Sequence, residues 1–298
     1  QLKIEQIKNK SNLQNILFII ISKSGNTIET LINSNMLKDK INSKNTIVIT
    51  EEKKNLLNTF AKNKKILHII HKDYIGGRYS ILSEVGMIPA YFMGLKINSF
   101  RKNLVTFFKS KSKLILIESV AKLAHVYNLK KIKSIIFLNY SPQLNQFLYW
   151  CQQLMAESLG KKGKGILPVV SIAPRDHHSL LQLYLDGPKD KLFYIFTLNL
   201  NKKMKINNNI FGTPFKFAEN KELSKVLESQ KKALTKVFKK KNIPFREFKI
   251  NKVNEETLGE LFSYFMIETA LIGKIININP FDQPAVEEVK ILTKQYLS

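Results

Sequence analysis

Short runs of consecutive apolar residues alternate along the chain with longer segments in which apolar residues follow helical spacing. The runs are rich in β-branched residues, which is typical of strands buried on both faces of a parallel sheet. This rhythm predicts an α/β fold of two doubly wound parallel sheets flanked by helices, with ligands beyond the carboxyl ends of the strands. The expected strands are 16–21, 46–50, 66–70, 134–140, 167–172 and 191–198, with a short edge strand near 245–250.

Basic residues are concentrated in the segment 101–113, and the strand–helix rhythm then starts again. This predicts a first domain over 1–100, a second over 101–278 and a C-terminal helix over 279–298 that closes the site.

Two expected helices, 81–95 and 141–160, contain neither lysine nor arginine, and we expect both to be buried, the second nearly all round. The only charge of the second is Glu157, and Gln153 precedes it by one helical turn, so an amide and a carboxylate lie side by side. Burial disfavours the charged form of a carboxylate and so raises its pKa. A raised pKa suits a general base that works near neutral pH. The alternative is a capped or half-solvated glutamate at a helix end.

Composition narrows the classes of function. Forty-eight basic against twenty-three acidic residues give a net charge of +25, which invites a nucleic-acid or membrane-surface interpretation. The lysines are scattered through most elements, however, and this pattern fits an anionic small-molecule substrate better. Cys151 is the only cysteine, so an intrachain disulfide is excluded, and no apolar run approaches the roughly twenty residues of a membrane span. We expect a cytoplasmic protein that binds neither nucleic acid nor membrane.

The sequence SKSGNTIET directly follows the first expected strand and leads into a helix. A strand, a small-residue turn and a helix N-terminus form a ready anion site, because backbone N–H groups and the helix dipole face outward. Ser22, Ser24 and Thr27 add hydroxyl groups, and Lys23 adds a full positive charge. The alternative is an ordinary turn with hydroxyl caps.

Three further positions are candidates for the chemistry. Arg78 follows the third expected strand and precedes the lysine-free helix 81–95; its alternative is a surface arginine at a helix end. His177 and His178 stand where a strand gives way to a helix, but adjacent side chains point in different directions, so both do not serve one site. No Cys or further His lies at ligand spacing from them, so we expect no metal site.

In the tail, Gln283 and Lys290 are seven residues apart and share one face if the segment is helical. Pairing of Lys290 with Glu287 is the alternative.

Taken in order, five segments resemble the signature regions of the phosphoglucose isomerase family, over about 16–294 of the chain. The resemblance implies two sugar isomerase (SIS) domains, a homodimer with active sites at the subunit interface, and interconversion of glucose 6-phosphate and fructose 6-phosphate in glycolysis and gluconeogenesis, without metal or nucleotide. The segments are SKSGNTIET, GGRYSILSEVG, QQLMAESLG with KGKGILPVV, HSLLQLYLDGPKDK and NPFDQPAVEEVK.

The resemblance also implies roles for the matching residues. Glu157 matches the base that moves a proton through a cis-enediolate, and Arg78 matches the arginine that stabilises this intermediate. His178 matches the ring-opening histidine, which reaches the site of the partner subunit, and Lys290 a lysine that assists ring opening. The positions that match substrate and phosphate contacts are Ser22, Lys23, Ser24, Thr27, Gln153 and Gln283.

One family feature is missing. The glycine-rich GIGGS-type loop that usually precedes SKSGNT has no counterpart in residues 1–15, so we expect a fragment, or a first domain whose sheet is short of a strand. Two other functions stay open: a SIS-type module that binds a sugar phosphate and regulates a partner, and an inactive truncated remnant. A sensor of that kind has no need of Glu157, His178 and Lys290 together.

Overall fold

A computed structural model describes residues 2–9, 16–199, 204–207 and 209–297. The chain folds into two compact units, Gln1–Arg101 and Lys102–Ser298. The expected strand at 16–21 lies inside the described range, whereas residue 1 and residues 10–15, to which the missing glycine-rich loop was referred, lie outside it. The domain limits expected from the sequence stay predictions.

The first unit contains a parallel three-stranded sheet in the order β1 (Phe18–Ile21), β2 (Thr46–Thr50) and β3 (Leu67–Ile70). Its core is a cluster of aliphatic side chains from the strands and α3, centred on Val48 and Leu57. The helices of this unit are α1 (Leu2–Lys8), α2 (Ile28–Met36), α3 (Leu56–Asn63), α4 (Glu84–Phe92) and α5 (Ile97–Arg101), with a 3₁₀ helix at Gly77–Leu82.

The second unit contains a parallel four-stranded sheet, and its strand order β5-β4-β6-β7 places β4 and β6 in the centre. The strands are β4 (Ser134–Asn139), β5 (Leu167–Ile172), β6 (Lys191–Leu198) and β7 (Phe245–Ile250). The helices are α6 (Ser110–Leu129), α7 (Asn145–Leu159), α8 (Asp176–Ser179), α9 (Leu181–Asp186), α10 (Leu223–Lys240), α11 (Glu255–Ile275) and α12 (Glu287–Leu297), with 3₁₀ helices at Thr106–Phe108, Pro142–Leu144, Thr213–Ala218 and Pro284–Val286.

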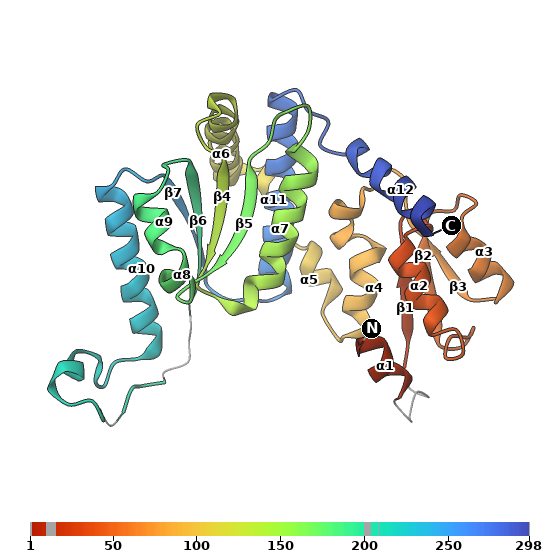
Figure 1. Cartoon of the computed structure of the whole chain (residues 1–298), viewed down its shortest axis with the longest axis horizontal. Coiled ribbons are helices and arrows are strands. Elements are labelled where there is room, and N and C mark those ends of the chain that lie inside the picture. The colour runs from red at the N-terminus through yellow and green to blue at the C-terminus, as the bar shows by residue number, and fades with distance from the viewer. Residues whose placement is uncertain (1, 10–15, 200–203, 208, 298) are drawn as a thin grey trace. The chain divides into compact units, whose positions relative to one another are not determined.

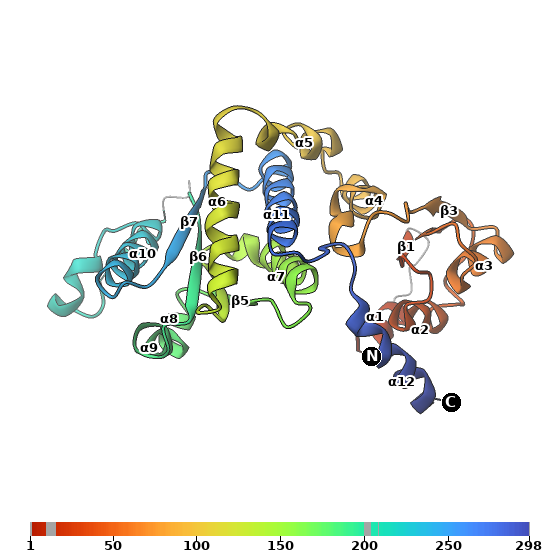
Figure 2. The same cartoon turned by 90° about the horizontal axis from the view of Figure 1, so that it is seen from above.

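Alternating side chains of β6 show that helices cover both faces of this sheet. Phe193 packs with Phe238 of α10 on one face. Phe196 packs against Phe147 of α7 and Phe265 of α11 on the other. Figure 2 shows α10 on one side of the strands and α7 and α11 on the opposite side. The expected class, two parallel sheets flanked by helices with a C-terminal helix, is therefore confirmed.

The two lysine-free helices are less buried than expected. In α7, Gln153 is exposed and Tyr149 is 48% exposed. In α4, Ala90 is the only fully buried residue, and Tyr91 is 68% exposed. A helix without lysine or arginine has no basic side chain that must reach solvent, but this does not show that another element covers the helix. The expectation of burial nearly all round was wrong for α7, and the expectation of a buried helix was wrong for α4.

An ion pair in the second unit ties β7 to α11. Glu268 is 1% exposed, and both of its oxygens accept hydrogen bonds from the guanidinium group of Arg246, at 2.7 and 2.8 Å. Ser119 of α6 and Tyr264 also donate to this carboxylate. Burial alone would raise the pKa of Glu268, but the charge and hydrogen bonds of Arg246, with those of Tyr264 and Ser119, hold it below its usual value.

We expect Glu268→Gln to destabilise the second unit by about 3 kcal/mol, because it leaves a buried guanidinium without its counter-charge. Urea unfolding followed by fluorescence of Trp150, whose ring packs 4.8 Å from that of Phe262 of α11, measures this effect. Glu118→Gln is the control, because the Glu118 side chain pairs with Lys122 while 66% exposed, and its midpoint should equal that of the wild type. Equal midpoints for all three proteins would contradict the expectation.

Candidate active-site residues

The turn after β1 is closed by its own hydroxyl groups. The Ser22 and Thr27 side-chain oxygens lie 2.8 Å apart in a hydrogen bond, and the backbone N–H of Gly25 donates to Ser22 Oγ at 3.1 Å. Ser22 is buried, whereas Ser24 and Thr27 are exposed. The hydroxyl groups proposed to contact phosphate therefore lie on one short turn at the carboxyl edge of the sheet.

Two helices begin near this turn, and only one has an open N-terminus. At α3, Asn55 caps the helix by accepting from the N–H of Asn58, and the N–H of Leu57 donates to the carbonyl of Gly25. At α2, the N-cap Thr27 makes no side-chain cap bond. The first N–H groups of a helix have no carbonyl partner within it, so α2 is the helix that can offer them to an anion.

Asn55 also fixes the shape of the turn. A Cβ atom on Gly25 would lie 1.9 Å from Asn55 Oδ1, and Gly25 has a φ of +66°. The Asn55 amide cannot move away cheaply, because its Nδ2 donates to the carbonyls of Glu51 and Lys53. Close packing and a left-handed backbone both require glycine at this position.

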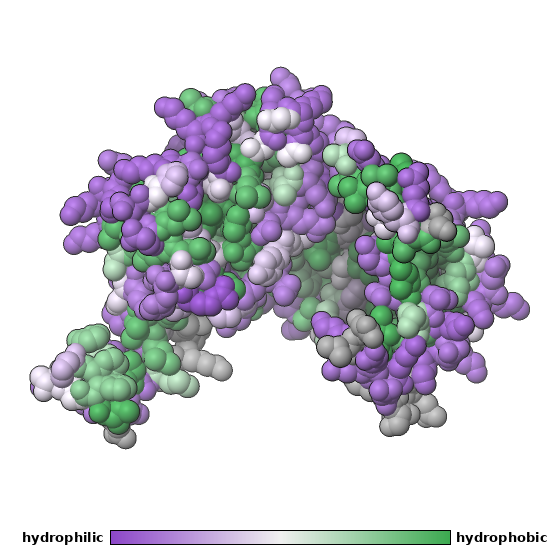
Figure 3. Space-filling model, viewed as in Figure 1, coloured by the Kyte–Doolittle hydropathy of each residue, from purple (hydrophilic) through white to green (hydrophobic). Residues whose placement is uncertain are grey.

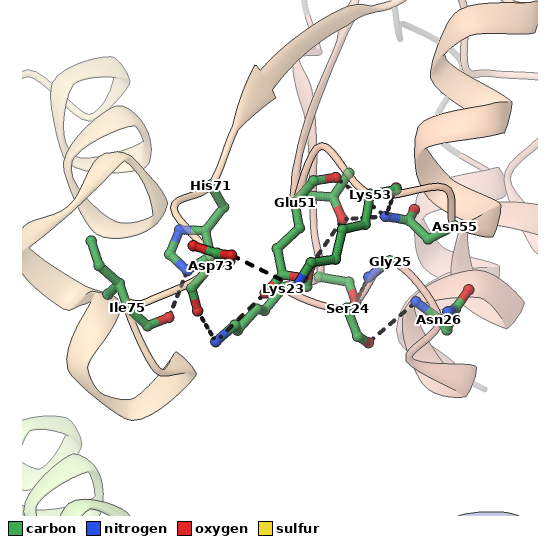
Figure 4. Close-up of polar contacts among 12 residues, drawn as sticks. Lys23, Ser24, Gly25, Asn26, Glu51, Lys53, Asn55, His71, Asp73 and Ile75 are labelled. Carbon is green, nitrogen blue, oxygen red and sulfur yellow. Dashed lines mark hydrogen bonds and ion pairs between the residues drawn. The ribbon is translucent and has the colours of Figure 1, made fainter. Parts of the chain in front are cut away.

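Four charged residues surround the turn, which Figure 4 shows from close by. Lys23 Nζ donates to the carbonyl oxygen of Asp73 at 2.8 Å and lies 3.5 Å from Glu51 Oε1. Lys53 Nζ lies 3.6 Å from Glu51 Oε2 and 3.7 Å from Asp73 Oδ2. We call these four residues the charge cluster; two lysines face two carboxylates in it.

Arg78 is only 2% exposed, so the alternative of a surface arginine is wrong. Its guanidinium carbon lies 5.4 Å from the centre of the Tyr79 ring. The preceding loop is held by His71, a buried residue whose Nδ1 lies 2.6 Å from Glu84 Oε1 at the start of α4. We call the turn of residues 22–27 after β1 the phosphate-type turn. The first unit thus places Arg78 and this turn after strands whose carboxyl ends share one edge.

In the second unit, Gln153 and Glu157 lie side by side as expected. Gln153 Nε2 donates to Glu157 Oε1 at 3.0 Å, with Gln153 exposed and Glu157 half-buried. Glu157 and Gln283 line one pocket of about 700 Å³, whose wall also contains Lys161, bound to Asp282 at 2.7 Å. The structure therefore brings together three of the candidate residues of this unit.

The two histidines after β5 differ as expected. His177 is half-buried and shares a 2.8 Å hydrogen bond with the Tyr140 hydroxyl group, whereas His178 is exposed. Burial, and then the charge of His178, lower the pKa of His177. The turn is anchored by Asp176, whose carboxylate accepts from the N–H of Ile172 at 2.7 Å. His178 is thus the histidine of the pair that is open to a ligand.

His178 and Glu157 lie at opposite edges of the second sheet. Helix α7 begins after the carboxyl end of β4 and returns the chain to the amino end of β5 (Figure 1). Glu157 belongs to the last turn of α7 and therefore lies at the amino edge. Helix α8, which carries His178, follows the carboxyl end of β5. Six residues of strand separate the two edges by about 20 Å. Within one subunit, these two side chains do not meet.

The tail departs from the expected geometry. Gln283 has a φ of −154° and precedes the 3₁₀ helix and α12, so it does not share a helix face with Lys290. Lys290 Nζ lies 2.6 Å from Glu287 Oε1, and its side chain is 58% exposed. Gln283 lies outside the helix because Pro284 begins the helical segment. The ion pair between Lys290 and Glu287, which was the alternative for the lysine, is present.

Within the described ranges, no group of three or more His, Cys, Asp or Glu side chains is arranged to hold a metal ion. None of the described helices has the length and apolar character that a membrane crossing requires.

Sequence reasoning missed three residues at the phosphate-type turn: Glu51, Lys53 and Asn55. They follow β2, and the available signal was their place at the carboxyl end of a strand adjacent to β1. The pattern alone does not show that Asn55 packs on Gly25 or that Lys53 bridges two carboxylates.

A family model described as phosphoglucose isomerase matches residues 1–170, which is more than half of the chain. The chain belongs to the phosphoglucose isomerase family. The candidate base Glu157, its neighbour Gln153 and the phosphate-type turn all lie inside the matched range. Membership of this family classes the chain as an aldose–ketose isomerase.

Relatives extend the likeness to nearly the whole chain. A glucose-6-phosphate isomerase of Methanocaldococcus jannaschii is 33% identical over an alignment of 300 positions, gaps included, that covers 97% of this chain and 73% of that protein. A probable glucose-6-phosphate isomerase of Methanococcus maripaludis is 32% identical over an alignment of 314 positions that covers 99% of this chain and 69% of that protein. The crystal structure of a hypothetical protein from Thermus thermophilus has a TM-score of 0.88 at 26% identity and covers 99% of this chain and 75% of its own.

Gly25→Ala is expected to lower the melting temperature by several degrees and to weaken binding of inorganic phosphate, because the new methyl group displaces Asn55. Gly94→Ala is a matched control: Gly94 also has a positive φ, +80°, but a Cβ there meets nothing within 4 Å. Calorimetry and phosphate titration of both variants test this expectation. A melting temperature for Gly25→Ala at or above that of Gly94→Ala would contradict it.

Proposed function

We propose that this chain interconverts glucose 6-phosphate and fructose 6-phosphate, the reaction named for its relatives and a step of glycolysis and gluconeogenesis. The observation that carries the proposal is the carboxylate–amide pair of Glu157 and Gln153, with Glu157 lining a pocket in an isomerase-family chain. Moving a proton between C1 and C2 needs one base that can take it and return it. Glu157 is that base.

The reaction proceeds through a cis-enediolate. Glu157 removes the proton from C2 of the open-chain aldose and delivers it to C1, while the hydroxyl proton on O2 passes to O1, so that the C1 aldehyde becomes a hydroxyl group and C2 becomes the ketone. The Gln153 amide, donating to Glu157 Oε1, holds the carboxylate in one orientation. Arg78 supplies fixed positive charge to the enediolate oxygens. Its burial supports this role, because low solvent exposure strengthens such an interaction.

The phosphate group of the substrate binds at the turn after β1. The hydroxyl groups of Ser22, Ser24 and Thr27, the Lys23 charge and the open N-terminus of α2 are the matching donors. Binding energy gained at this end positions the reacting carbons, which are remote from it. Gln283 contacts the sugar, and Lys290 leaves its partner Glu287 to assist ring opening.

A homodimer supplies His178 to the partner's site. The separation of His178 from Glu157 by the length of β5 supports this arrangement, since a ring-opening acid must reach the same sugar as the base. A cluster of exposed apolar side chains on the segment before α10 supports a second copy; Phe217 is 76% exposed and Ile210 82% (Figure 3, lower left).

The second candidate is a module that binds a sugar phosphate without turning it over, and the third is an inactive remnant. The intact phosphate-type turn is compatible with both. The Glu157–Gln153 pair favours catalysis, because binding of phosphate does not need a carboxylate.

Glu157→Gln is expected to lower kcat about 10²- to 10⁴-fold with little change in KM, because the amide cannot accept the C2 proton. A coupled assay that converts fructose 6-phosphate to glucose 6-phosphate and oxidises the product measures the rate. Glu228→Gln, which removes an exposed carboxylate paired with Lys232, is the control and should keep the wild-type rate. Full activity of Glu157→Gln would refute the mechanism, and an inactive wild type that binds phosphate would favour the module.

Mixing two inactive variants tests the shared site. If His178 acts in the partner's site, a heterodimer of Glu157→Gln and His178→Ala subunits has one intact site and one doubly altered site. Random exchange of equal amounts should then restore about a quarter of the wild-type activity. If both residues serve the same subunit's site, every site carries a defect and no activity returns. Co-refolding followed by the coupled assay distinguishes these outcomes.

A further inference from the structure

The Lys23 side chain, although its charge is proposed to hold the substrate phosphate, is engaged within the protein. Its Nζ binds the Asp73 carbonyl oxygen and pairs with Glu51, whose side chain is only 11% exposed (Figure 4). A carboxylate this close to the turn competes with a phosphate dianion for Lys23 and repels the dianion as well. The second carboxylate of the charge cluster, Asp73, adds to the repulsion.

We propose that Lys53 is a positioning residue that keeps Lys23 available to the phosphate by neutralising Glu51 and Asp73. This inference rests on the proposed function of the turn after β1. Lys53 Nζ lies within 3.7 Å of both carboxylates and bridges the loop after β2 to the loop after β3. It pairs with the Glu51 oxygen that Lys23 does not contact, so each lysine takes one oxygen.

The net charge of the cluster explains the effect. With both lysines present, two positive charges balance two negative charges, and an arriving dianion meets a neutral cluster. Without Lys53 the cluster has a charge of −1, and Glu51 keeps Lys23 as its remaining partner in the cluster. Lys53 itself is 69% exposed on its side chain, so salt screens its influence strongly.

This role makes a specific kinetic pattern. Lys53 acts on the phosphate end of the substrate, and this end does not react. Removal of the Lys53 charge should therefore weaken the binding of the substrate and of the transition state equally. KM should rise while kcat stays unchanged. A residue that merely stabilises the fold would lower the melting temperature or the amount of active enzyme instead.

The test compares Lys53→Met with Lys54→Met, which removes the same charge from the next exposed residue, one that makes no ion pair within the described part of the chain. At low ionic strength, we expect Lys53→Met to raise the KM for fructose 6-phosphate and the Kd for inorganic phosphate about fivefold, and Lys54→Met to raise each by less than about twofold. The difference should shrink at high ionic strength, and Lys53→Arg should restore wild-type values.

Equal effects of the two methionine variants would overturn the inference, as would a loss of kcat in Lys53→Met or a difference that salt does not change. Titration of inorganic phosphate by calorimetry separates the two proposals. If phosphate binding weakens in Lys53→Met but the wild type isomerises nothing, the inference holds and the proposed activity fails. If the wild type binds no phosphate, the inference fails.

Discussion

The parallel direction of every strand pair is the constraint on which the arrangement of functional residues depends. Parallel strands must be joined by crossovers, so each helix returns the chain to the starting edge, and all loops that follow strands gather at the other edge. In the first unit this brings the turn of Lys23, the loop of Glu51 and the loop of Arg78 to one edge. In the second unit it sends Glu157 and His178 to opposite edges.

If Glu157 and His178 act on one sugar as proposed, that opposition requires a second copy of the chain. A helix that starts at one edge ends at the other, so a base in its last turn cannot share a site with an acid that follows a strand. Either the chemistry does without one of them, or another copy of the chain supplies it. The same constraint keeps Lys161 and Glu157 near each other, because the loop from α7 to β5 begins where the helix ends.

Much of the fold follows from local pattern. The expected strands 46–50, 167–172, 191–198 and 245–250 coincide with β2, β5, β6 and β7. In β2 and β6, consecutive apolar β-branched and aromatic residues fit a sheet that is covered on both faces. The charged residues of β7 fit its place at the edge of the sheet. Helix burial did not follow in the same way: α4 lacks lysine and still exposes Tyr91. Local composition records what a helix tolerates, and only tertiary packing decides what covers it. The spacing of Gln283 and Lys290 did not place them on one helix face for a local reason: Pro284 begins the helical segment, so Gln283 lies ahead of it.

The site shows a second limit of pattern, because its key contacts join residues that are distant in sequence. Nothing near Gly25 in the chain indicates that Asn55 packs on it, or that Lys53 shares two carboxylates with Lys23. The net charge of +25 is consistent with an anionic substrate, but it does not show how charges are arranged at one site. The charge cluster at the proposed phosphate site is balanced, two lysines against two acids. Long-range attraction can raise the rate at which a dianion arrives. Whether the dianion stays depends on which carboxylates the local lysines already neutralise, and that is set by three loops brought together by parallel pairing.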